Sequence, residues 1–553
     1  WPYVCILTWS KEVERSCKTM ILGLFVLASR PCRNIVTIRI SHVFPLFKLL
    51  LVVWLLLLGV SGCSENPPLE LFDVTEKSIE ELQVAMETGA VTSEKLVEMY
   101  LARIEAYDQR GPAINSIIVL NPEAAETARA LDEERQVSGI RSPLHGIPVL
   151  IKDNYDMAGL PTTNGSIAMA SVKPPDDAFQ VRRLREAGAV ILGKTNLHEF
   201  ARGITTVSSL GGQTRNPYDT LRNPGGSSGG TGAAIAASFS AAGMGSDTCG
   251  SIRIPSMHNN LVGLRGTEGL SSRDGVVPLS HTQDIAGPLT RTIADLAIML
   301  DATVGTDPAD LITLDADSQI PSTYTSSLNA DGLDGARLGL LTTLVVQEPA
   351  DQTVADVITS AVIDLERLGA TVIEVDIDGL TDLLDTYVVL SHEFKFGLEA
   401  YLAAIPDSPV SSLTQILTDQ LHHPSVRERL EQSNAVESLD TDEYREALSR
   451  REVLRLAVFT AMDEFEIDAL VYPTLRQQAA RIGERQGGDN CRLSAQSGLP
   501  AITVPAGFTT DDMPVGLEML SRRFTEPKLI EFAYAFEQGT KHRRPPSSTP
   551  PLP

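Results

Sequence analysis

Three segments of the chain carry side chains that could act in nucleophilic catalysis. Lys152 directly follows an apolar run at 147–151, Ser227 lies in a glycine-rich segment at 223–232, and Ser251 lies 24 residues further on. A lysine at the end of a buried strand can be desolvated, and desolvation would lower its pKa from about 10.4 to the 7–8 that a base needs. A serine at the end of a small-residue loop can combine a nucleophile with free N–H groups.

Each segment also has an ordinary structural interpretation. Taken alone, Lys152 could be a snorkelling lysine, and the segment 223–232 could be a flexible linker. A linker would not lead straight into Ala-Ala-Ile-Ala-Ala at 233–237, which predicts a packed helix. Of the nine histidines only His145 lies in these segments, and we expect it to have a structural role.

One match to a phosphate-binding loop is a false lead. Residues 188–195 fit the pattern G-x-x-x-x-G-K-[ST], in which the four middle residues form a loop around phosphates. Here those residues are Ala-Val-Ile-Leu, which predict a strand instead. We therefore do not expect ATP binding.

The surrounding pattern predicts an α/β architecture. From Ser78 onward apolar residues recur at helical spacing, with Thr92 and Ser93 as expected helix caps. The short apolar runs at 147–151 and 189–192 predict buried strands, and residues 233–242 predict a small-residue helix. Alternating strands and helices favour layered α/β packing. Residues 320–460 carry no chemical signature.

Composition limits the partners. The 553 residues have a formal charge of −25, which becomes −30 without residues 1–62. A surface this acidic repels phosphate backbones, so nucleic acid is not an expected partner. Only Cys249 and Cys491 lie in the expected catalytic body, without a C-x-x-C pair or a Cys/His cluster. The cysteine pattern therefore supports neither a disulfide framework nor a zinc site, and no metal is expected.

The N-terminal region resembles a lipoprotein signal. Lys48 precedes a run of twelve apolar or small residues at 49–60, too short to span a membrane as a helix, and the run ends in Val-Ser-Gly-Cys63. This resembles the bacterial lipobox, in which the cysteine is acylated, and it implies a catalytic domain anchored outside the cytoplasm in the cell envelope. The alternatives are an uncleaved anchor or a soluble protein with a misread start, because the chain begins with Trp1.

These features predict five regions. They are a doubtful extension at 1–42, a signal peptide at 43–62, a tether at 63–77, a catalytic domain at 78–544 and a disordered Pro-rich tail at 545–553.

Together the motifs resemble the amidase signature family. The matches are I-K-D-N at 151–154, the frame GGSSGG…GSD…GSIRIP at 225–255, and Gly-Leu-Pro-Ala-Ile-Thr-Val-Pro-Ala at 498–506. Further matches lie at 193–196, 211–217, 272–276 and 287–291, and the resemblance covers about 78–535. It implies one large domain with a mixed β-sheet covered by helices on both faces. Segments 211–217 and 393–401 are most similar to peptide amidases.

The resemblance also implies residue roles. Ser251 would be the nucleophile, Ser227 the bridging serine after a cis Gly226–Ser227 bond, and Lys152 the base, without a cofactor. The substrate would be a small carboxylic amide or peptide amide. The oxyanion hole would consist of the backbone N–H groups of Thr248, Cys249, Gly250 and Ser251.

Some positions depart from the family pattern. Cys249 stands where glycine is usual, and a glycine there could serve a positive φ that cysteine reaches only with strain. Residues 257–260 and 265–267 also differ from the family pattern. We expect Asp247 and Arg253 to support the loop and not to act in the chemistry.

Three functions remain open. The first is an exported, lipid-anchored amidase. The second is the A-type subunit of a glutamine amidotransferase, which would need cytosolic ATP and charged tRNA. The third is a non-catalytic binding lipoprotein that kept the fold, suggested by Cys249 and the altered 257–260 segment.

Overall fold

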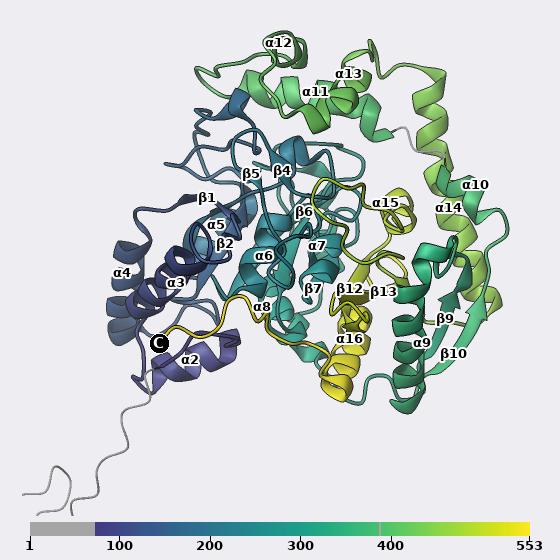
Figure 1. The fold of residues 1–553 in the computed structure, drawn as a ribbon, viewed down its shortest axis with the longest axis horizontal. Coiled ribbons are helices and arrows are strands. Elements are labelled where there is room, and N and C mark those ends of the chain that lie inside the picture. The colour runs from purple at the N-terminus through teal and green to yellow at the C-terminus, as the bar shows by residue number, and fades with distance from the viewer. Residues whose placement is uncertain (1–71, 386–388) are drawn as a thin grey trace, which may run out of the picture. The chain divides into compact units, whose positions relative to one another are not determined.

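Apolar runs bounded by turn residues become the strands of one mixed sheet (Figure 1). The computed structural model describes residues 72–385 and 389–553, so the predicted signal peptide and Cys63 lie outside the described residues. The eleven strands of the sheet follow in spatial order: β1 (Ile117–Leu120), β3 (Val190–Thr195), β2 (Pro148–Lys152), β6 (Ala242–Asp247), β8 (Ile285–Thr290), β7 (Val262–Arg265), β12 (Ala501–Phe508), β13 (Pro514–Leu520), β11 (Ala469–Pro473), β9 (Arg337–Leu341) and β10 (Thr371–Val375).

The strand directions place the predicted lysine at a shared edge. Strand β2 runs parallel to both β3 and β6, so the carboxyl ends of these three strands lie together. Strands β9, β10 and β11 are parallel to one another as well, and the remaining pairs in the sheet are antiparallel. A separate two-stranded sheet joins β4 (Val207–Ser208) and β5 (Gly212–Gln213).

Helices cover both faces of the large sheet. Strands β2, β3, β6 and β8 are buried at every position, and because successive side chains point to opposite faces, neither face meets solvent there. This confirms the predicted α/β fold. The described helices are α2 (Ile79–Glu87), α3 (Ser93–Tyr107), α4 (Ala124–Ser138), α5 (Phe179–Glu186), α6 (Gly229–Ala236), α7 (Arg253–His258), α8 (Ile293–Thr303), α9 (Gln352–Arg367), α10 (Leu380–Asp385), α11 (Val389–Ala404), α12 (Leu413–Thr418), α13 (Arg427–Asn434), α14 (Asp442–Glu464), α15 (Arg492–Ser497) and α16 (Glu526–Thr540).

Helices α11, α12 and α13 gather at one end of this unit, away from the central strands (Figure 1). They pack around an apolar cluster that includes Phe394, Leu398, Leu413 and Leu430 and also contains Phe200 and Val277 from outside these helices. This group supplies part of the wall of the cavity that Ser251 lines.

Local signals fix several helix boundaries. Ser78 caps α2 in a capping box with Glu81, and Thr92 caps α3, while Ser93 is the first residue of that helix and not its cap. The predicted helix at 233–242 instead begins at Gly229 and ends at Ala236. It ends early because Ser238 adopts a positive φ and the chain then enters β6. Within the described ranges, every helix is too short or too polar to cross a bilayer.

Both predicted terminal boundaries need correction. Residues 72–77 belong to the folded unit and not to a tether, because Val74 is buried in the core and Glu76 pairs with Arg543 at 2.7 Å. The tail at 545–553 is ordered, so the prediction of disorder was wrong. The backbone carbonyls of Thr549 and Pro550 accept hydrogen bonds from the buried Arg103, which holds the tail on α3.

Candidate active site

Lys152 is the last residue of β2, and its side chain is fully buried. Its Nζ donates to Ser227 Oγ at 2.7 Å and to Ser246 Oγ at 2.8 Å. Burial lowers the pKa of Lys152 to about 7, although the negative charges of Asp284 and Asp247 act in the opposite direction. A large fraction of this amine is therefore neutral near pH 7, as a general base requires.

Ser246 is a part of the site that the sequence did not single out. It lies near the end of β6, which pairs in parallel with β2, and its Oγ accepts from both Lys152 and Asn154. The register of the two strands brings these ends together. In the sequence, Ser246 belongs to the Gly245-Ser-Asp247 part of the family frame, but nothing about this serine alone indicated a role in the site.

Ser227 joins the lysine to the nucleophile segment. It is fully buried, and the peptide bond between Gly226 and Ser227 is cis, as the resemblance implied. Gly225 before it has a φ of +78°, and a Cβ there would lie 2.8 Å from the Cα of Pro255. Only glycine fits this close approach of the serine loop to α7.

Ser251 lies in the loop 248–252 between β6 and α7, which we call the nucleophile loop. Its backbone carbonyl accepts the N–H of Ser228 at 3.2 Å, so the two serine segments are in direct contact. Ser251 lines a cavity of about 360 Å³, whereas Ser227 and Lys152 are fully buried and are not among its lining residues.

The hydrogen-bonded chain is half formed. Lys152 contacts Ser227, but within the described residues no hydrogen bond joins Ser227 Oγ to Ser251 Oγ. The structure therefore brings the three predicted residues to one place and forms the first of the two links that a proton relay needs.

The predicted oxyanion amides differ in availability. The N–H of Gly250 donates to Asp247 Oδ1 at 2.7 Å and is therefore already engaged. The N–H groups of Thr248, Cys249 and Ser251 donate no hydrogen bond to any residue that the structure describes. Thr248, Cys249 and Ser251 also line the cavity. These three amides remain candidates for binding an oxyanion.

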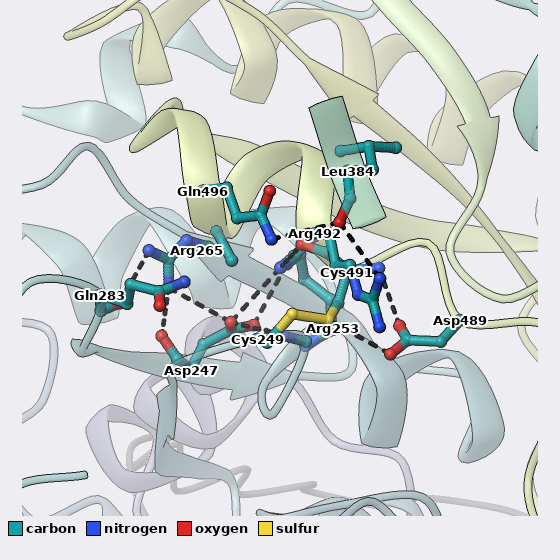
Figure 2. The surroundings of a disulfide bond; sticks show 12 residues. Asp247, Cys249, Arg253, Arg265, Gln283, Leu384, Asp489, Cys491, Arg492 and Gln496 are labelled. Carbon is teal, nitrogen blue, oxygen red and sulfur yellow. Dashed lines mark hydrogen bonds and ion pairs between the residues drawn. A yellow bond between two sulfur atoms is a disulfide. The ribbon is translucent and has the colours of Figure 1, made fainter. Parts of the chain in front are cut away.

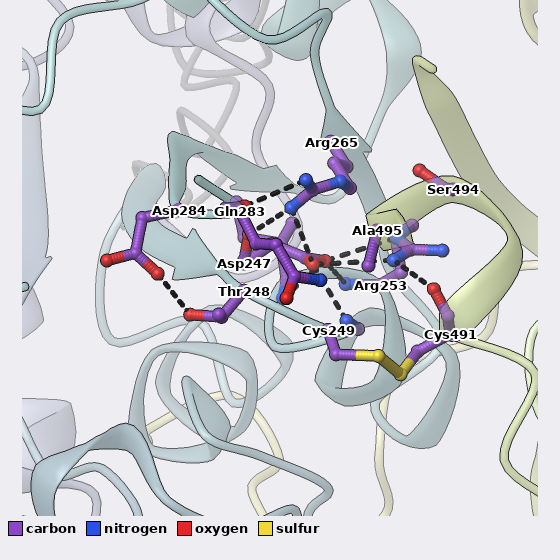
Figure 3. Close-up of polar contacts among 12 residues, drawn as sticks. Asp247, Thr248, Cys249, Arg253, Arg265, Gln283, Asp284, Cys491, Ser494 and Ala495 are labelled. Atoms are coloured by element: carbon purple, nitrogen blue, oxygen red, sulfur yellow. Dashed lines mark hydrogen bonds and ion pairs between the residues drawn. A yellow bond between two sulfur atoms is a disulfide. The ribbon is translucent and has the colours of Figure 1, made fainter. Parts of the chain in front are cut away.

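A buried ionic network holds the start of the nucleophile loop. Asp247 pairs with Arg253 and Arg265 (Figure 3). Arg253 also pairs with Glu518. Burial alone would raise the pKa of Asp247, but the two arginine charges hold it well below its usual value. Asp247 and Arg253 thus support the loop, as expected, and Arg265, one of the departures from the family pattern, is a part of that support.

Cys249 forms a disulfide with Cys491, although the cysteine pattern in the sequence supported no disulfide framework (Figure 2). The two residues are 242 positions apart in sequence, and their Cα atoms are 5.1 Å apart. Cysteine spacing gave no signal, because only the tertiary fold brings the N-terminal end of α15 to the nucleophile loop. Cys249 lies outside the left-handed region, which Gly250 occupies with a φ of 81°, so the expected strain at position 249 is absent.

The disulfide also bears on the metal expectation. Donor atoms of Cys249, Cys491 and Asp489 lie within 4.8 Å of one another, which is close enough for a metal site. The two sulfur atoms are bonded to each other, so in this state they are not thiolate ligands.

The phosphate-loop match at 188–195 forms no phosphate loop. Residues 190–195 are strand β3, and Lys194 pairs with Asp153 at 2.8 Å in a fully buried contact. His145 is buried too, and its Nε2 bonds to the backbone carbonyl of Leu131 at 2.9 Å. Both residues therefore have structural contacts away from the cavity.

Comparison with known proteins identifies relatives across most of the chain. A model of the Amidase family matches residues 95–530. The chain is 36% identical to a probable amidase of Arabidopsis thaliana, covering 90% of this chain and 96% of that protein. It is also 36% identical to the A-type subunit of the glutamyl-tRNA(Gln) amidotransferase of Moorella thermoacetica, covering 86% of this chain and 99% of that protein.

Solved structures give the same picture. The peptide amidase of Stenotrophomonas maltophilia is 38% identical with a TM-score of 0.78, covering 87% of this chain and 99% of that one. The A-type subunit of the glutamyl-tRNA(Gln) amidotransferase of Thermotoga maritima is 28% identical with a TM-score of 0.68, covering 86% of this chain and 97% of that one.

Proposed function

The chain belongs to the amidase family, and on this premise we propose that it is a serine amidase that hydrolyses a peptide amide or small carboxylic amide through an acyl-enzyme on Ser251. The observation that carries the proposal is the fully buried 2.7 Å contact between Lys152 Nζ and Ser227 Oγ, together with the position of Ser251 in the wall of a cavity.

The proposed reaction moves one proton out and back along the same path. Neutral Lys152 takes the proton of Ser227 as Ser227 takes that of Ser251, and Ser251 Oγ attacks the amide carbonyl carbon. The relay then returns the proton to the departing nitrogen as the C–N bond breaks. A water molecule, deprotonated along the same path, hydrolyses the ester on Ser251.

The missing link fits a resting state. The Ser251 side chain turns about a single bond, and the two serine segments are in contact, so we propose that Ser251 Oγ reaches Ser227 by a change of rotamer in the substrate complex. Catalytic hydrogen bonds are often formed only with substrate bound. Free amides of Thr248, Cys249 and Ser251 would then stabilise the oxyanion.

A peptide amide is the substrate class we favour. Among the solved structures, similarity to the peptide amidase exceeds that to the amidotransferase protein. Helix α11, which carries the segment 393–401, supplies Leu390 and Ser391 to the cavity wall. The amidotransferase role remains the second candidate, because curated proteins with that role match over nearly their full length.

The test is to incubate the full-length protein with a panel of peptide amides and carboxylic amides, and separately with a serine-reactive fluorophosphonate. We expect turnover and a label on Ser251, with both lost in Ser251→Ala. Absence of the label and of turnover in the wild-type protein would refute the serine amidase. Copurification of partner subunits together with cytosolic location would favour the amidotransferase.

We also propose that Cys63 is lipidated and that the catalytic domain lies outside the cytoplasm. The lipobox-like sequence supports this, and so does the Cys249–Cys491 disulfide, because disulfides persist in oxidising compartments. In a bacterial host fed a labelled fatty acid, the wild-type chain should carry the label in the membrane fraction. If Cys63→Ser were labelled and sedimented like the wild type, this part of the proposal would be wrong.

A further inference from the structure

We propose that the Cys249–Cys491 disulfide is a positioning element of the active site, which holds the nucleophile loop in its working geometry so that turnover depends on the intact bridge. The inference rests on the proposed amidase chemistry. Neither cysteine touches the reacting atoms in the proposal; the bridge acts through the backbone amides around Cys249.

Each residue at the start of the nucleophile loop has its own anchor. The Thr248 hydroxyl donates to Asp284 (Figure 3), and the N–H of Gly250 donates to Asp247. Between them, the Cys249 side chain packs against an apolar cluster, and its one covalent or hydrogen-bonded link within the described residues is the bridge to Cys491. The bridge therefore anchors the residue that lies between two of the candidate oxyanion amides.

The far end of the bridge is firmly held. The Cys491 N–H donates to Asp489 at 2.8 Å, and the Cys491 carbonyl accepts from Arg253 at 3.4 Å. Next to it, the side-chain amide of Asn490 donates to the backbone carbonyls of Leu344 and Pro473 at 2.9 and 2.8 Å. A bond to such a fixed point restricts Cys249 more than a contact with a mobile loop would.

The bridge can be reached through the active-site cavity. Cys249 is half-buried and lines the cavity together with Ser251, while Cys491 is only 2% exposed. A small dithiol entering this cavity would reduce the bridge by exchange: the S–S bond breaks, each cysteine sulfur gains a proton, and the dithiol becomes a disulfide. A bound inhibitor should slow this reduction because it occupies the same space.

Loss of the bridge should affect kcat more than KM. An oxyanion contact strengthens in the transition state, and removing one donor costs about 10²–10³ in rate. Releasing the tether misplaces the amides without removing them, so we expect kcat to fall by about 10- to 100-fold.

The experiment compares full-length wild type, oxidised and dithiol-reduced, with the double variant Cys249→Ser/Cys491→Ser and with Cys63→Ser as a cysteine control. Peptide mapping reports the bridge, and kcat, KM and thermal unfolding are measured on each sample at a temperature well below every Tm. We expect reduction to lower kcat reversibly in wild type and Cys63→Ser. The double variant should have a low kcat before any treatment, and the dithiol should not change it.

In a second double variant, Cys249→Gly/Cys491→Ser, residue 249 is the glycine usual in the family. Its backbone N–H is retained, and the bridge is lost. Wild-type kcat in either double variant, or a loss that follows Tm alone, would overturn the inference while leaving the serine amidase intact. An oxidised wild-type protein without turnover and without a label on Ser251 would instead refute the proposed function.

Discussion

Lys152 and Lys194 show how surroundings determine the role of one residue type. Both are fully buried and lie at the carboxyl ends of the neighbouring parallel strands β2 and β3. Lys194 faces the carboxylate of Asp153, whereas Lys152 faces the hydroxyls of Ser227 and Ser246. A carboxylate stabilises the ammonium form, while two hydroxyls do so much less, and this leaves Lys152 free to act as a base.

Replacing the two lysines should separate chemistry from folding. A positioned base contributes about 10²–10⁴-fold to the rate. Lys152→Ala should therefore lower kcat by about 10³-fold or more, while the protein stays folded. Lys194→Met should lower the free energy of unfolding by about 3–5 kcal/mol, because Asp153 stays buried without its partner. Activity at low temperature and urea unfolding measure the two effects; equal and mild losses of kcat in both variants would contradict the base assignment.

The activity should depend on pH through Lys152. Its pKa of about 7 lies below the ordinary 10.5, and the base works when neutral, so kcat/KM should rise with pH and level off above about pH 7. The unfolded chain binds the extra proton between about pH 7 and 10.5, so this group makes the free energy of unfolding increase with pH over that window.

Urea unfolding at two pH values within that window checks the second statement. The increase should be smaller in Lys152→Met, which has no group to titrate at this position. An activity profile without an acid limb near pH 7 would argue against a lysine base.

At the scale of elements, contacts with several strands and helices hold the nucleophile loop in place. It leaves β6, is held by Asp247 and by the bridge to the start of α15, and enters α7. Glu518 of β13 reaches the same network through Arg253, and Arg265 of β7 joins it through Asp247, so three strands and two helices fix one short loop. Fixed amides need no reorganisation when the oxyanion forms, which is what makes such a loop catalytic.

Neutralising Asp247 should weaken the whole network. Asp247→Asn leaves Arg253 and Arg265 buried with less compensating charge, so we expect a loss of about 3–5 kcal/mol in the free energy of unfolding, measured in urea. Glu98→Gln breaks the exposed pair with Lys95 and should cost under about 1 kcal/mol. Similar small losses in the free energy of unfolding in both variants would mean that the network does not stabilise the loop.

At the scale of the molecule, hydrogen bonds and an ion pair hold the two ends of the described chain together. The C-terminal tail runs to α3 (Figure 1). Arg103 of α3 donates to Thr549 and Pro550, and Arg543 pairs with Glu76 just before α2. The Cys249–Cys491 bridge links loops 242 residues apart. These contacts join the first and last parts of the fold to each other, and the nucleophile loop to the start of α15.

Removing residues 545–553 should destabilise the protein. Arg103 would lose two backbone acceptors in a buried position, and we expect the free energy of unfolding to fall by about 1–3 kcal/mol. Removing only residues 551–553 keeps both acceptors and serves as the matched control. Thermal unfolding of the two truncations compares them; identical Tm values would show that the tail contributes nothing.

The sequence by itself determined the local features. Apolar runs predicted β2 and β3, the helical spacing from Ser78 and the Thr92 cap predicted the starts of α2 and α3, and the order of Lys152, Ser227 and Ser251 in their motifs predicted the family. These signals are readable because each depends on neighbours within a few residues.

Only the tertiary structure decided the contacts between distant segments. It placed Ser246 beside Lys152 through the register of β2 and β6, joined Cys249 to Cys491, and seated the tail on Arg103. It also left Ser251 Oγ unlinked to Ser227 in this state. Such contacts depend on how whole strands and helices pack, and a pattern along the chain carries no record of which remote residues that packing brings within hydrogen-bond distance.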